Sequence, residues 1–224
     1  MFHQPVFQQS LTIDSIFDAV VLTYQTLSTR VLRTLHLSIR ATILHSLNAS
    51  TQSNIYIDTL LSDPDPAILA LNAVLVAFDT EVCTYIPTAS YAHITRGLAA
   101  LMDTYLLSLC TQKIERMNTN GCALMQLNIL VLQQNLKNIE DGATLPLAAL
   151  FFDLFTAGPD AIVARAKQYG RDYGVPGEMF GEQEVKMLLQ MTYEEKVNDQ
   201  NREASVQAKR ALDAQLLEIS EFMY

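Results

Sequence analysis

Glycine and proline restrict helix formation more than any other residues, and this chain almost lacks them over long stretches. Neither occurs between Pro5 and Pro64. Both residues weaken or break helices, glycine through its backbone freedom and proline through its missing N–H. Over the same stretch apolar side chains recur every three or four positions, at Phe17, Val20, Tyr24, Leu27, Val31, Leu35, Ile39, Ile43 and Leu47. This spacing predicts one long helix from about Asp14 to Leu47.

A second helix has a clear start signal in the segment "SDPDPAILA". Asp65 is a good N-cap, and Pro66 suits the first helical position, where its missing N–H is harmless. This helix should end before Pro87, because the residue before a proline disfavours the helical conformation. A further helix is expected from Thr88 to about Arg116, with Gly97 as its weak point.

The rest of the chain also shows helical spacing, and no alternating strand pattern of convincing length occurs. The other elements that we expect are a short helix over 55–61, a turn at 118–121, helices that begin at Pro146 and Pro159, a glycine-rich flexible loop over 169–181, and one or two helices over 182–223. The predicted fold class is therefore all-α.

The segment "MNTNGCALMQLNILVLQQNL" has no charged residue, yet amides interrupt it throughout. About 20 apolar residues could cross a bilayer, but lipid cannot satisfy the donors and acceptors of these amides. A helix buried inside protein fits better, and no other run of spanning length is expected. Its apolar stripe, which we expect to form the structural core, is Met125, Ile129, Leu132, Leu136 and Ile139.

The composition is that of a globular protein, with 50% hydrophobic and 17% charged residues. A net charge of -9 repels phosphate backbones, so we expect no nucleic-acid partner. The cysteines Cys83, Cys110 and Cys122 lie in apolar stretches without C-x-x-C pairing, which favours buried, reduced thiols. No cation precedes Arg30, so the basic region of a signal peptide is missing and we expect a soluble intracellular protein.

The distribution of charge suggests two parts. Residues 1–141 carry 18 charged side chains, whereas the shorter span 142–224 carries 21. We therefore expect a tightly packed helical bundle over 1–141 and a more charged helical extension over 142–224, ending in an amphipathic helix.

That last helix carries a narrow apolar seam, formed by Leu212, Leu216, Ile219 and Met223. The seam could dock on the chain's own bundle or bind a helix of another protein. We expect the helix to project at least in part, because the preceding segment "NDQNRE" and the glycine-rich loop offer little apolar surface to hold it. The seam is then a candidate partner-binding site.

No catalytic or cofactor motif is present in the sequence. Phosphate-binding loops, nucleophile elbows and Glu-x-x-His metal pairs are all missing, and His36 and His45 point to opposite sides of their helix. We expect no enzyme activity, no metal, no cofactor and no small-molecule substrate. A helical lipid- or cofactor-binding enzyme with an unrecognised site, or an unrelated helical adaptor, remains the alternative.

A small basic group lies on the first helix at Arg33, His36 and Arg40. These side chains share one face and could bind lipid phosphates or an acidic partner. The alternative is pairing with carboxylates of the same bundle, such as Asp58 or Asp63, because three cations fall short of the usual lipid-binding cluster.

Several segments resemble, in order, the C-terminal region of the exocyst complex component 4 family. They are "VLRTLHLSIRATILHSL" (31–47), "SDPDPAILALNAVLVAFDTEV" (62–82), "ITRGLAALMDTYLLSL" (94–109) and "MNTNGCALMQLNILVLQQNLKNI" (117–139). The core "NILVLQQNLKNI" is the most specific, and the resemblance weakens after Glu140.

The resemblance implies an elongated stack of antiparallel helical bundles, as in the rod-shaped subunits of tethering complexes. It implies a non-catalytic exocyst subunit that helps to tether secretory vesicles to the plasma membrane before SNARE-mediated fusion. The partners would be other exocyst subunits, with indirect association with vesicle and plasma membranes, and the location cytoplasmic at sites of secretion. The chain would correspond to the C-terminal part of a longer subunit.

Overall fold

The computed structural model describes residues 6–171 and 180–223, so residues 172–179 of the expected glycine-rich loop lie outside the described residues. In chain order the elements are α1 (Val6–Ser50), β1 (Asn54–Ile55), α2 (Pro66–Tyr85), α3 (Thr88–Thr95), α4 (Leu98–Lys113), β2 (Arg116–Met117), α5 (Thr119–Ile139), α6 (Pro146–Ala157), α7 (Pro159–Arg171), α8 (Glu182–Val197) and α9 (Arg202–Phe222). The all-α prediction is confirmed.

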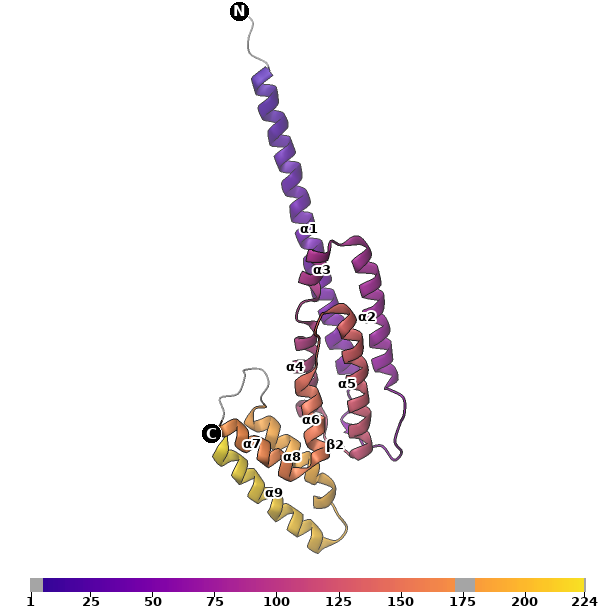
Figure 1. The fold of residues 1–224 in the computed structure, drawn as a ribbon, viewed down its shortest axis with the longest axis vertical. Helices are drawn as coiled ribbons and strands as arrows, with labels where there is room; N and C mark the ends of the chain where they lie inside the picture. The colour runs from indigo at the N-terminus through magenta and orange to yellow at the C-terminus, as the bar shows by residue number, and fades with distance from the viewer. Residues whose placement is uncertain (1–5, 172–179, 224) are drawn as a thin grey trace, which may run out of the picture.

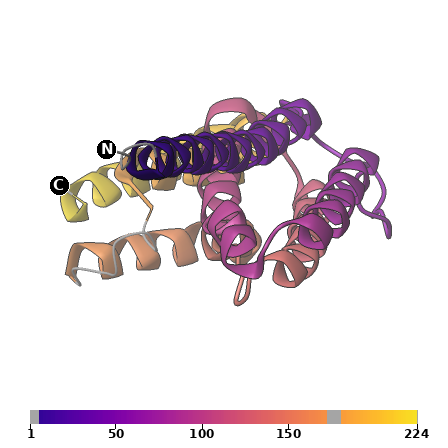
Figure 2. The same cartoon turned by 90° about the horizontal axis from the view of Figure 1, so that it is seen from above.

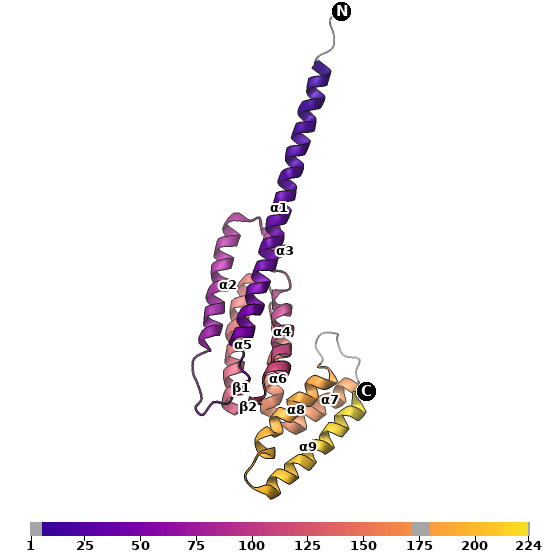
Figure 3. The ribbon, with the colours of Figure 1, turned by 180° about the vertical axis from the view of Figure 1, so that it is seen from behind.

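The molecule is elongated, with two groups of helices (Figure 1). The C-terminal half of α1, together with α2, α3, α4, α5 and α6, forms a bundle along the long axis. Helices α7, α8 and α9 gather at the end of this bundle that lies opposite the N-terminus (Figure 3). Seen from above, α1 runs obliquely along one side of the bundle, and α2 and α5 lie side by side (Figure 2). Helix α6 contacts both groups, and the division near Gly142 stays a prediction.

The signals predicted for α2 are confirmed. The Asp65 side chain accepts a hydrogen bond from the N–H of Ala67, Pro66 is the first helical residue, and the helix ends at Tyr85. The helix expected from 88 to 116 is instead two helices, α3 and α4. The break falls at Gly97, whose φ of 79° lies in the left-handed region that favours glycine.

The expected short helix over 55–61 is wrong. Residues 54–55 pair in parallel with residues 116–117, so the chain between α1 and α2 is extended there. The turn predicted at 118–121 is wrong as well, because α5 already begins at Thr119 with Asn118 as its N-cap. Both errors have one cause: the amides at the start of α5 bind the backbone of the 54–58 segment, as described below.

The buried core runs through both groups of helices, and the predicted stripe on α5 belongs to it. All five residues are at most 9% exposed, namely Met125, Ile129, Leu132, Leu136 and Ile139. Leu132 and Leu136 are the most deeply covered, at 1% and 0%. The periodicity therefore predicted correctly which side of α5 faces inward.

The final helix docks, so the expectation that it projects is wrong. Ile219 is fully buried, and Leu212, Leu216 and Met223 pack against the core. Helix α9 lies along α7 and α8, and Lys167 of α7 forms an ion pair with Glu218 of α9 at 2.5 Å. The apolar surface that holds α9 comes from α7 and α8, which contribute buried residues such as Ile162 and Leu189. The expectation failed because it considered only the polar segments that precede α9.

Helix α2 is long and apolar enough to cross a membrane by length and composition alone, with a mean hydropathy of 1.6. The expectation that only the 117–136 run reaches this length is therefore wrong. Its charged residues, Asp79 and Glu81, fall near its C-terminal end. One side of α2 packs on α1 and α5 through Ile68, Leu71, Leu75 and Val82, and its opposite side is exposed.

Candidate partner-binding surfaces

The amide side chains of α5 bind backbone groups of neighbouring segments, which explains why an uncharged helix carries so many polar side chains. Asn118 accepts a hydrogen bond from the N–H of Ile57 at 3.2 Å and donates one to its carbonyl at 2.8 Å. Asn120 donates to the carbonyls of Ile57 and Asp58 at 3.1 and 3.2 Å. The extended segment between α1 and α2 is thereby fixed to the N-terminal end of α5.

Further amides bind the segments on either side of α5. Asn128 is buried and accepts from the N–H of Asp65 at 2.8 Å. Asn135 donates to the carbonyl of Asn72 at 3.1 Å, and Gln133 accepts from the N–H of Leu145 at 3.2 Å. Neutral amides satisfy these partly buried backbone groups without the larger desolvation cost of charges. They fix the neighbouring segments of the bundle to α5.

Arg40, one member of the predicted basic group, binds backbone carbonyls rather than a carboxylate of the bundle. Its guanidinium donates to the carbonyls of Ile94 and Arg96 at 2.8 and 2.7 Å, at the end of α3. The Glu140 carboxylate accepts from the N–H groups of Gly97 and Ala99 at 2.6 and 3.0 Å, at the start of α4. Burial lowers the pKa of Arg40, and the Glu140 charge opposes that shift. The two side chains together hold the break between α3 and α4.

We expect Arg40→Met to lower the free energy of unfolding by about 2 kcal/mol, because carbonyls at the end of α3 lose charge-assisted hydrogen bonds. Urea denaturation followed by circular dichroism measures this. Arg33→Met is the matched control on the same helix: Arg33 is exposed, so its change should stay within about 0.5 kcal/mol. Equal losses in the two variants would contradict the role of Arg40.

The other two members of the basic group do not join Arg40 in one binding site. Arg33 is exposed, and in the described part of the chain it forms no ion pair, with Asp58, Asp63 or any other carboxylate. The His36 ring stacks on His93 of α3, with centroids 5.9 Å apart, and its Nδ1 lies 3.0 Å from Arg40 Nη1. His36 and Arg40 therefore contact α3, and a lipid or acidic-partner role for the group stays a prediction.

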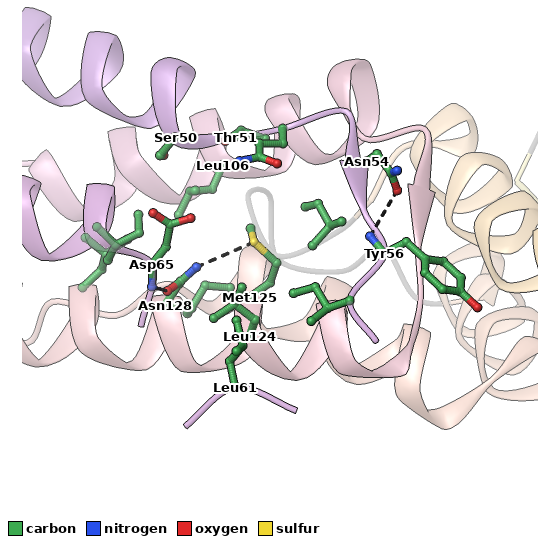
Figure 4. Close-up of a pocket in the computed structure, with 16 residues that line it drawn as sticks. Ser50, Thr51, Asn54, Tyr56, Leu61, Asp65, Leu106, Leu124, Met125 and Asn128 are labelled. Carbon is green, nitrogen blue, oxygen red and sulfur yellow. Dashed lines mark hydrogen bonds between the residues drawn. The ribbon is translucent and has the colours of Figure 1, made fainter. Parts of the chain in front are cut away.

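A small cavity lies beneath the segment that joins α1 and α2 (Figure 4). Its volume is about 260 Å³, and most of its lining is apolar, including Leu106, Leu124 and Met125. Asn128 lies beside it, with its Nδ2 atom 3.9 Å from the Met125 sulfur. Drug-sized ligands usually occupy about 300–1,000 Å³, so this cavity is below the usual range.

Buried ionisable groups elsewhere also have structural partners. Asp103 is 4% exposed and accepts from the N–H groups of Leu147 and Ala148 at 3.0 and 2.8 Å, which caps the start of α6. Burial raises the pKa of its carboxyl above the usual value, and the two hydrogen bonds oppose this shift only in part. Burial also raises the pKa of the Cys110 and Cys122 thiols. Cys83 is exposed on the outer side of α2, contrary to the expectation that all three thiols are buried.

Within residues 6–171 and 180–223, no group of three or more His, Cys, Asp or Glu side chains could hold a metal ion. The candidate surfaces are instead apolar and exposed. Helix α1 projects beyond the bundle (Figure 1). Between Ile13 and Val31 it carries apolar residues that are between 47% and 70% exposed. The sequence identified this apolar face, but it could not show that the face lies outside the bundle.

These features define a class of protein: an elongated all-α protein whose polar side chains fix its helices to each other. No family model matches the chain. Three curated proteins do. A probable exocyst complex component sec8 of Neurospora crassa is 35% identical over 93% of this chain, an exocyst complex component sec8 of Schizosaccharomyces pombe 24% over 84%, and an exocyst complex component 4 of Mus musculus 27% over 67%.

The chain therefore belongs to the Sec8 family, which is the exocyst complex component 4 family of mammals. It spans about one fifth of the length of these relatives, between 16% and 22%.

Proposed function

We propose that this chain is a non-catalytic segment of an exocyst subunit, which helps to tether secretory vesicles to the plasma membrane before SNARE-mediated fusion. The observation that carries the proposal is the similarity to three named exocyst components over two thirds or more of the chain. The proposed partners are other exocyst subunits, and the proposed location is the cytoplasm at sites of secretion.

The architecture supports a scaffold role. The buried side chains of Asn128 and Asp103 and the partly buried side chain of Glu140 bind backbone atoms of neighbouring segments, which favours one fixed arrangement of helices. A rigid elongated body suits a subunit that holds other proteins at a fixed distance. Within this proposal, residues 1–141 form the bundle and residues 142–224 the charged extension, whose first helix, α6, packs on α4 and α5 of the bundle.

The experiment is the capture of a tagged full-length chain from the cells in which it is expressed, followed by mass spectrometry. We expect several other exocyst subunits in near-equal amounts. The Leu132→Asp variant should lose them, because the bundle unfolds, whereas Leu130→Asp, which changes a half-exposed residue of the same helix, should stay folded and retain them. Recovery of an unrelated set of proteins would support the adaptor alternative instead.

A further inference from the structure

The cavity beneath the segment that joins α1 and α2 is lined by residues from four helices of the bundle. Among them are Ser50 of α1, Ile68 of α2, Leu106 of α4 and Leu124 of α5. The cavity volume is about 260 Å³. Since an apolar cavity of about 150 Å³ holds one benzene molecule, this cavity has room for a ligand of about ten non-hydrogen atoms.

A buried amide at the cavity wall has hydrogen-bonding capacity to spare. Asn128 is 4% exposed, and its Oδ1 atom accepts from the N–H of Asp65 at 2.8 Å, which fixes the orientation of the amide. Its Nδ2 atom carries two donors, yet within the described residues its hydrogen-bond partner is the Met125 sulfur, at 3.9 Å (Figure 4). A thioether is a weak acceptor, so a ligand that accepts a hydrogen bond from Asn128 is favoured.

The Asp65 carboxylate is the second polar group of the cavity, and it lies beside Asn128 (Figure 4). Its Oδ1 atom accepts from the N–H of Ala67, and Asp65 is the only charged residue among the described residues that line the cavity. Its charge repels a carboxylate or phosphate of a ligand, whereas an ammonium group has no lone pair for Asn128. A hydroxyl both accepts and donates through one atom, which suits two groups that lie side by side.

The apolar part of the lining suits an aromatic ring. Ile68, Leu106 and Leu124 are buried and form apolar walls. The Met125 sulfur lies next to Asn128, and sulfur atoms make favourable contacts with the edges of aromatic rings. A rigid ring also loses less conformational freedom on binding than a chain with the same number of atoms. The lining therefore favours a ring that carries one hydroxyl.

We propose that this cavity is a binding site for a phenol, that is, a neutral aromatic ring with one hydroxyl. The hydroxyl accepts a hydrogen bond from Nδ2 of Asn128 and donates one to the Asp65 carboxylate, and the ring packs on Leu124 and Met125. A free small phenol and the tyrosine side chain of another polypeptide both carry this group. This inference goes beyond the proposed function and does not depend on it.

The test uses the ¹⁵N-labelled full chain and two probes, p-cresol and toluene, which differ only by the hydroxyl. In NMR titrations p-cresol should shift the side-chain NH₂ signals of Asn128 with a dissociation constant below about 1 mM, which is within reach of a ligand this small. Toluene should bind at least about fivefold more weakly, because it offers Asn128 no acceptor. No shift with p-cresol at about 5 mM, or equal affinity for toluene, would overturn the proposal.

A matched pair of variants locates the probe. Leu124→Phe adds volume inside the cavity and should abolish the shift, whereas Leu130→Phe, at a half-exposed position of the same helix outside the lining, should retain it. Circular dichroism checks that both variants fold. Nuclear Overhauser contacts between p-cresol and the Met125 methyl group give the same information in the unchanged chain. Undiminished binding by a folded Leu124→Phe variant, or p-cresol that binds without contacting Met125, would also overturn the proposal.

A third probe, N-acetyltyrosinamide, separates the two sources of the phenol. It carries the same ring and hydroxyl on a peptide unit. Affinity for p-cresol alone would support the site with a free small phenol as its ligand. Similar affinity for both probes would support the site with a tyrosine side chain of another polypeptide as its ligand.

Discussion

Replacement of Leu132 by aspartate is expected to unfold the chain. Leu132 is 1% exposed and lies on the inner stripe of α5, next to Ile129 and Leu136. A carboxylate placed there either stays charged without a partner or must take up a proton, and both states cost free energy. We expect a loss of about 5 kcal/mol, which matches the total stability of many domains. Circular dichroism at 25 °C should then show a largely unfolded chain.

The matched control for this change is Leu130→Asp. Leu130 lies two positions away on the same helix, is 51% exposed and leaves the new carboxylate in contact with water. Its cost should stay within about 1 kcal/mol, because only a partly exposed apolar side chain is lost. If the two variants melted at the same temperature, the inward face of α5 would be assigned incorrectly.

Gly121→Ala is expected to be the second most damaging change, although alanine favours helices more than glycine does. A Cβ atom at Gly121 would lie 1.9 Å from the carbonyl oxygen of Ile55 and 3.0 Å from its carbonyl carbon. The helix would have to move away from β1 and weaken the hydrogen bonds between Asn118 and Ile57. We expect a net loss of about 3 kcal/mol, after a gain of about 1 kcal/mol from helix propensity.

Urea denaturation of this variant should be compared with that of Gly181→Ala. At Gly181 the nearest atom to a new Cβ is an oxygen of Glu184 at 3.6 Å, and φ is -71°, which alanine adopts readily. Gly181 is the N-cap of α8, where alanine is a poorer cap than glycine, so we expect this control to lose no more than about 1 kcal/mol. Similar stability of the two variants would show that the approach of α5 to the 54–58 segment is looser than described.

Local patterns in the sequence predicted most of the helices and the inner side of α5. Capping by Asp65, the proline at position 66 and the apolar spacing of 125–139 act over a few residues, so neighbouring positions contain the information. The absence of glycine and proline after Pro5 likewise predicted a long α1. The family resemblance was also carried by local segments, of which 128–139 is the most specific.

Contacts between distant residues decided the rest. The 55–61 segment is extended because Asn118 and Asn120, about 60 positions later, bind its backbone. Arg40 binds the end of α3 across 54 positions rather than a carboxylate, and α9 is held by faces of α7 and α8. The apolar face of α1 is buried at Ile39 and Ile43 and exposed at Phe17 and Tyr24, although apolar residues recur every three or four positions along the whole helix. Helical periodicity depends on local backbone geometry, so the sequence determined most of the helices and which side of each is apolar. Burial depends on which other segments pack against that side, so only the tertiary structure determined along how much of its length each apolar side is covered.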